Sequence, residues 1–95
     1  MKKIEYTGTV YVLDHKYPEP LLSHTIRKLQ ELRIKKEDIT ITDSPEKPKI
    51  GSIVVEVFPY HLEIARVRTI RNDSFISGSL MTVELKADAN GKYID

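Results

Sequence analysis

The sequence predicts an α+β fold: a mostly antiparallel sheet of about five strands with one amphipathic helix packed on one face, in the order β-α-β-β-β-β. Three observations lead to this prediction. Three apolar runs follow one another within residues 51–86, separated only by turn-sized gaps. Residues 4–13 alternate with a period of two, and one segment after Pro20 has the periodicity of a helix.

The length and composition indicate one ordinary globular domain that spans residues 1–95. The chain has 95 residues, of which 40% are hydrophobic and 31% charged, with both signs mixed along the sequence. The formal net charge is +1, so no overall field attracts the chain to nucleic acid or to an anionic membrane. We therefore expect any partner to be recognised by a local surface.

The residue types also restrict the chemistry and suggest a location. Cysteine is absent, which excludes disulfides, thiolate metal sites and a cysteine nucleophile. No apolar run approaches the ~18 residues of a membrane span, and the first residues lack the apolar core of a secretion signal. We therefore expect a cytoplasmic protein. The scarcity of Asn and Gln, with abundant Ile, Lys, Arg and Glu, favours a thermophilic source.

The first half of the chain reads as strand, helix and strand. Residues 4–13 predict a long strand, in which Gly8 marks a bulge or a close neighbour. Pro18 and Pro20 end the ladder and open the helix, because proline is tolerated in a first helical turn. The helix is expected to end within residues 32–35, and residues 39–42 predict a strand parallel to the first. The apolar helix face, an arc of roughly 140°, holds Leu21, Leu22, Thr25, Ile26, Leu29 and Leu32.

The second half predicts an antiparallel meander. A loop at 43–49 with two prolines precedes strands at 52–58, 61–70 and 75–86, and the turn pair Asn90-Gly91 predicts a short terminal hairpin. Neither side of the 61–70 strand is uniformly apolar. We interpret this as a β-bulge near residues 64–66 that switches the inward side and sends Arg66 and Arg68 outward.

One helix of ~14 residues is roughly 21 Å long and covers only one side of such a sheet. The other side is expected to hold several large apolar residues, which is typical of an interface. Across a two-fold axis this face would make a symmetric homodimer. In the alternative, the 43–49 loop and the terminal hairpin fold over it. The interface residues predicted from this pattern are Tyr11, Leu13, Val54, Phe58 and Leu80, with Ile76 nearby.

Arginines on the 61–70 strand raise a second possibility. Arg66, Arg68 and Arg71, with Tyr60 at the start of the strand, have the side chains for contacting phosphates and stacking on bases. The competing interpretation, which the net charge near zero favours, is that Glu56 and Glu84 pair with these arginines across the sheet.

The histidines give little support for catalysis. No pair has the spacing of a helical zinc site, and His24 lies opposite the apolar helix face, where solvent exposure is expected. A site between subunits built from Asp14, His15 and His61 stays open as an alternative. Glycine and serine patterns match no phosphate-binding loop and no nucleophile elbow. We therefore predict no catalytic residue, no metal and no cofactor.

Together these patterns predict a small non-enzymatic binding module that self-associates through the uncovered sheet face. The alternatives are a nucleic-acid-binding protein that uses Arg66, Arg68, Arg71 and Tyr60, and a small enzyme with a site between subunits. A further protein partner is compatible with either binding function, and no membrane association is expected.

Overall fold

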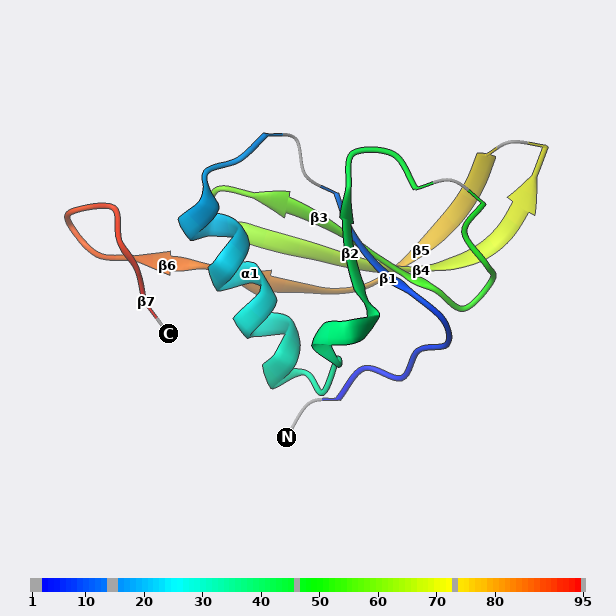
Figure 1. The fold of residues 1–95 in the computed structure, drawn as a ribbon, viewed down its shortest axis with the longest axis horizontal. Coiled ribbons are helices and arrows are strands. Elements are labelled where there is room, and N and C mark those ends of the chain that lie inside the picture. Colours follow the sequence, from blue (N-terminus) through cyan, green and yellow to red (C-terminus); the bar gives the residue numbers. More distant parts are fainter. Residues whose placement is uncertain (1–2, 14–15, 46, 73, 95) are drawn as a thin grey trace.

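A mixed five-stranded sheet with one helix on one side forms the body of the protein in a computed structural model, which describes residues 3–13, 16–45, 47–72 and 74–94 (Figure 1). The strand order is β2-β1-β3-β4-β5. The broad α+β class is thus confirmed. The elements are β1 (Val10–Leu13), α1 (Glu19–Glu31), the 3-10 turn η1 (Lys36–Asp38), β2 (Ile39–Thr42), β3 (Ile53–Phe58), β4 (His61–Arg71), β5 (Ser74–Glu84), β6 (Lys86–Ala87) and β7 (Tyr93–Ile94).

The expectation of a mostly antiparallel sheet is wrong. Strand β1 is parallel to β2, as predicted, but it is also parallel to β3 on its other side. Only β3, β4 and β5 pair antiparallel. The physical reason is the connection between β2 and β3, which returns the chain along the length of the sheet, so that β3 starts at the same end as β1.

Strand β1 is shorter than the predicted strand at 4–13. Gly8 adopts a φ of 74°, a left-handed conformation that interrupts an extended ladder. The preceding residues instead run beside the end of α1, where the Ile4 amide donates to the Leu32 carbonyl at 3.2 Å. The Thr7 amide donates to the Gly51 carbonyl at 3.3 Å.

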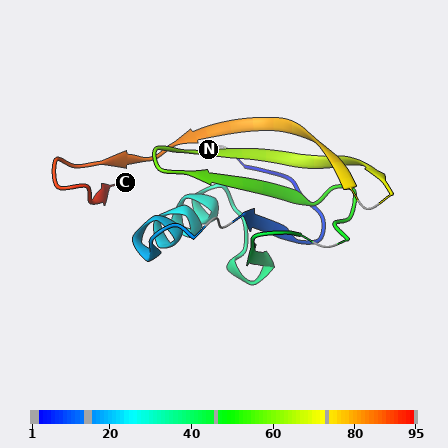
Figure 2. The same cartoon turned by 90° about the horizontal axis from the view of Figure 1, so that it is seen from above.

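The core lies between α1 and the side of the sheet that faces it (Figure 2). The helix begins with proline in its first turn, as the sequence predicts, and buries Leu21, Thr25 and Leu29. Fully buried strand residues of the same cluster are Val10, Val12, Ile53, Val55, Val57, Leu62 and Ile64. No helix in the described part of the chain is long and apolar enough to cross a membrane.

The small β6–β7 hairpin confirms the predicted terminal hairpin, and it packs against α1. The Tyr93 ring stacks on His24 with a centroid separation of 5.4 Å, and the Tyr93 hydroxyl donates to the Pro59 carbonyl at 3.0 Å. His24 is fully buried, so the prediction that it is solvated is wrong. A helical projection treats the side away from the sheet as solvent, whereas here the chain terminus covers it.

Tyr6 attaches the N-terminal segment to the η1 turn. Its hydroxyl donates to the Asp38 carboxylate at 2.6 Å and accepts the Lys35 amide at 3.2 Å. Burial and the hydrogen bond to Asp38 raise the pKa of Tyr6 above its ordinary value of 10.0. The folded state therefore favours the neutral phenol.

We predict that Tyr6→Phe lowers the free energy of unfolding by about 1 kcal/mol at pH 8, because the hydrogen bonds of the hydroxyl are lost. Since the pKa is raised on folding, this contribution is complete below pH 10.0 and is lost as the pH rises through the folded value. Urea unfolding of both proteins from pH 8 to 11 measures it. A difference that stays constant or widens above pH 10 would contradict the assignment.

Candidate functional site

The side of the sheet opposite α1, here called the uncovered face, has no other described element packed on it in Figure 2. Val54 and Val67 are buried, yet they lie outside the core cluster beneath α1, as expected for residues that point to the other side. Strand register then identifies the remaining members of this face, because directly paired residues share a side. They are Tyr11, Leu13, Glu56, Phe58, His61, Glu63 and Ala65, with Thr40, Thr42, Ser77, Ser79, Thr82 and Glu84 on the flanking strands.

Most of the predicted interface residues lie on the uncovered face. Val54 retains 5% of its exposure, while Tyr11, Leu13 and Phe58 are half-buried. Leu80 does not lie on this face. Ile64 pairs with Met81 and Ala65 pairs with Ser79, so Leu80 is an extra, unpaired residue in β5. Its side chain packs against the core cluster.

Within the described part of the chain, the centre of this face keeps a hollow of about 190 Å³, lined by Val54 and its neighbours on β3, β4 and β5. The terminal hairpin packs on α1 instead, and the start of the β2–β3 connection borders the Tyr11 edge. The centre of the uncovered face is therefore accessible to another molecule.

The charges on the uncovered face are acidic. The register places Glu56 directly opposite Glu63, and like charges in this position repel. The Nε2 of His61 lies 3.5 Å from the Glu63 carboxylate, and the His61 ring stacks on Phe58 at 4.6 Å. This paired carboxylate centre could not be predicted without the register.

The arginines lie elsewhere. Arg66 pairs with Ile53 and Gly78, which places it on the α1 side of the sheet, and it donates a hydrogen bond to the Glu5 carbonyl. Arg68 is the extra residue of a second irregularity, between Val67 and Thr69. The predicted irregularity near residues 64–66 exists, but the β3–β4 ladder stays regular there, so the expected switch of side is wrong.

The proposed cross-strand partners do not meet these arginines. Glu56 lies opposite Glu63, and Glu84 lies opposite His61. The expectation that Glu56 and Glu84 neutralise the arginines is therefore wrong. Arg68 and Arg71 are exposed, and no ion pair involving either is found among the described residues.

Tyr60 is 72% exposed in the β3–β4 turn, at the other end of β4 from Arg71. At about 3.3 Å per residue it is roughly 26 Å from Arg68 along the strand. A compact site that combines Tyr60 with the arginines is therefore not formed within one chain.

Of the predicted site built from Asp14, His15 and His61, the structure describes only His61. Asp14 and His15 lie outside the described residues, and His61 faces Phe58 and Glu63 on the uncovered face. Within the described ranges, no group of three His, Asp or Glu side chains is arranged to hold a metal ion.

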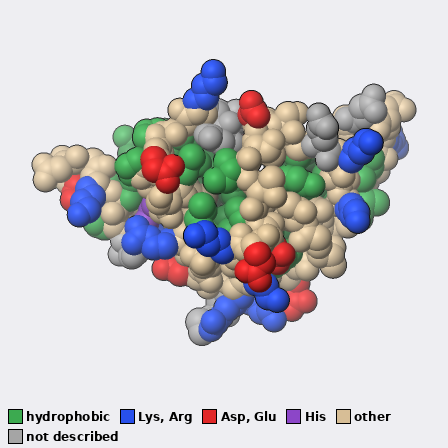
Figure 3. All heavy atoms as spheres, in the orientation of Figure 1, with side chains coloured by type: hydrophobic (Ala, Val, Ile, Leu, Met, Phe, Trp, Pro, Cys, Tyr) green, Lys and Arg blue, Asp and Glu red, His purple; other side chains and the backbone are tan. Residues whose placement is uncertain are grey.

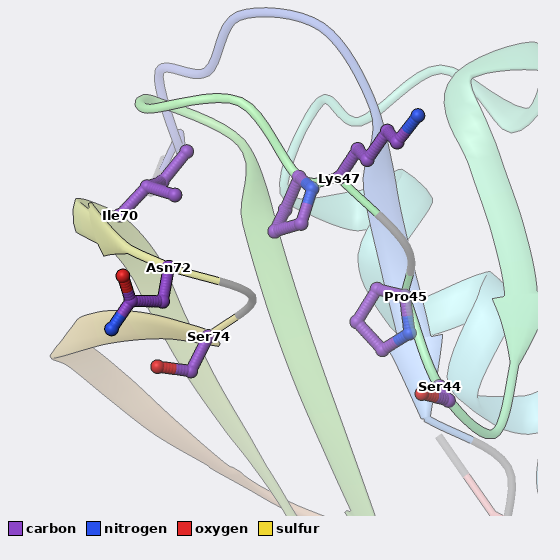
Figure 4. Close-up of a pocket in the computed structure, with 7 residues that line it drawn as sticks. Ser44, Pro45, Lys47, Ile70, Asn72 and Ser74 are labelled. Carbon is purple, nitrogen blue, oxygen red and sulfur yellow. The ribbon is translucent and has the colours of Figure 1, made fainter.

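A cavity of about 430 Å³ lies between the β2–β3 connection and the β4–β5 hairpin (Figure 4). Ser44, Pro45 and Lys47 line one side, and Ile70, Asn72 and Ser74 line the other, with Pro48 completing the wall. Its lining combines Ile70 and two prolines with polar residues, and Figure 4 shows the Lys47 ammonium pointing away from Ile70 and Asn72. Sequence reasoning missed this cavity, because its two sides are brought together only by the return of the chain across the sheet.

Comparisons with protein-family models, curated proteins and solved structures found no match to this chain.

We predict that Glu56→Gln raises the free energy of unfolding by roughly 0.2–1 kcal/mol at low ionic strength, because it removes repulsion from Glu63. The gain should shrink in 1 M salt, where exposed charges are screened. The matched control is Glu84→Gln, since Glu84 faces His61 and should give no gain. Urea unfolding checks both; equal effects of the two substitutions would exclude the proposed repulsion.

Proposed function

We propose that this protein is a small non-enzymatic binding module that self-associates as a homodimer through the uncovered face. The observation that carries the proposal is the set of half-buried apolar side chains, Tyr11, Leu13 and Phe58, around Val54 on a side without a described covering element. A second copy would remove these side chains from water, which is favourable in proportion to the apolar area buried.

The charges restrict how two copies meet. A two-fold contact brings the same surface of each copy together, so the Glu56–Glu63 pairs would repel if they were stacked directly. The favourable arrangement offsets the two sheets, so that the Glu56–Glu63 pair of one copy does not lie over the same pair of the other copy.

The size of the face predicts weak association. Five strands about 4.8 Å apart and some six residues long present roughly 20 by 24 Å, or about 500 Å². This is below the ~800 Å² per partner of a standard stable interface. We therefore place the dissociation constant in the micromolar range, where dimer and monomer exchange with concentration.

We predict that Phe58→Glu shifts the protein to monomer across 1–500 μM, because it adds a charge to the apolar part of the interface. The matched control is Ile41→Glu. Ile41 is 43% exposed and pairs with Val12, so it lies on the α1 side and should leave association unchanged. Multi-angle light scattering measures both. A wild-type protein that stays monomeric throughout this range would refute the proposed dimer.

A further inference from the structure

The projecting end of the β4–β5 hairpin carries a positive surface that is separate from the uncovered face. Figure 3 shows Lys and Arg side chains over this end on the α1 side of the molecule. In the sequence, residues 43–50 and 66–74 hold five basic and three acidic side chains, a net charge of +2, against +1 for the whole chain. The register directs the glutamates of β3 and β5 away from Arg68 and Arg71.

Gly78 on β5 leaves room for the side chain of Arg68. A Cβ atom built at Gly78 would be 2.0 Å from Nε of Arg68 and 2.8 Å from Cδ and Cζ. Gly78 is not among the residues with positive φ, so its backbone conformation does not require glycine. Glycine within a strand is unfavourable and often marks a close approach. Here the close approach is that of the Arg68 side chain, which lies across β5.

The neighbouring arginines extend this surface along one strand. Arg66 is held by its hydrogen bond to the Glu5 carbonyl, and Arg71 is exposed at the end of β4. Along the strand, Arg66 and Arg68 are about 7 Å apart, and Arg68 and Arg71 are about 10 Å apart. Flexible arginine side chains at these distances can contact successive charges of a linear polyanion. Such contacts need no aromatic residue, so the distant Tyr60 is not required.

The cavity of Figure 4 lies at the same end of the sheet, between the β2–β3 connection and the β4–β5 hairpin. Ile70 and Asn72, which flank Arg71 in the sequence, line it together with two prolines and Lys47. The apolar walls, formed by Ile70 and the two prolines, suit the faces of a flat heterocycle. Only an unpaired base is free to enter, because duplex bases are stacked within the helix.

We propose that Arg66, Arg68 and Arg71 bind the phosphate backbone of single-stranded nucleic acid, and that the cavity at the same end of the sheet accepts an unpaired base. This binding surface is independent of the proposed homodimer contact, because the arginines and the uncovered face lie on different sides of the sheet. Phosphate contacts supply affinity without sequence information, so the binding is expected to be sequence-tolerant and sensitive to salt.

The first test is the double substitution Arg68→Gln and Arg71→Gln, measured by fluorescence anisotropy with a labelled mixed-sequence single-stranded oligonucleotide. We expect at least a tenfold loss of affinity. The slope of log affinity against log salt should fall in magnitude by about 1.4, which corresponds to two phosphate contacts. The matched control, Lys86→Gln with Lys92→Gln, removes the same charge from the exposed terminal hairpin and should retain the affinity. An equal loss in the control would overturn the proposal.

The second test is Gly78→Ala, which changes no charge. The added methyl group must displace the Arg68 side chain, so we expect a several-fold loss of affinity while unfolding shows an intact fold. Unchanged affinity would contradict a positioned Arg68. Tighter binding to a duplex of the same sequence, or binding only to anionic vesicles, would overturn the proposed ligand class.

These experiments distinguish nucleic-acid binding from self-association. Phe58→Glu should bind the oligonucleotide with wild-type affinity per chain if the surfaces are independent. The arginine variants should retain the wild-type oligomeric state in light scattering. Loss of oligonucleotide binding in Phe58→Glu alone would contradict independent surfaces.

Discussion

The structure depends on a mismatch between one helix and a five-stranded sheet. Helix α1 has 13 residues and is therefore about 20 Å long, enough to cover one side of the strands it crosses. All the fully buried residues of the core cluster lie between α1 and that side. The terminal hairpin could have covered the other side, but Tyr93 packs on His24 instead. This packing shields the outer side of α1 from solvent and leaves the second side of the sheet exposed to solvent or to a partner.

The regular β3–β4 ladder then determines where the charges go. It directs Glu56 and Glu63 to the uncovered face and Arg66 to the α1 side, so opposite charges that alternate along the sequence do not neutralise one another across the strands. The two irregularities lie in the β4–β5 pairing and leave the β3–β4 ladder unchanged. At the first, the extra residue Leu80 packs against the core cluster, and at the second, the extra residue Arg68 lies over Gly78. The result is an apolar and acidic face and a basic end, which are suited to different partners although the net charge is only +1.

Local patterns predicted the elements well and their arrangement less well. Alternation and helical periodicity identified α1 and the β3–β5 meander, because these depend on which side of each element is apolar, and the handedness of a strand–helix–strand connection predicted the parallel β1–β2 pair. These patterns could not identify β3 as a parallel neighbour of β1. The alternation of apolar residues within a strand is the same whichever strand lies beside it. Tyr11, Val54 and Phe58 were assigned to the uncovered face from parity alone. Strand register and tertiary packing had to be known before three other features could be identified. These are the Glu56–Glu63 pair, the position of Arg68 over Gly78 and the burial of His24.

Hydroxyl-radical footprinting as a function of protein concentration would show whether copies of this chain meet through the uncovered face. We expect that oxidation of Tyr11 and Phe58 falls as the concentration rises from low to high micromolar. Tyr60, which is 72% exposed in a turn, should keep a constant rate and serves as the internal reference. Constant oxidation of Tyr11 and Phe58 in a sample that scattering shows to associate would place the contact elsewhere and contradict the proposed interface.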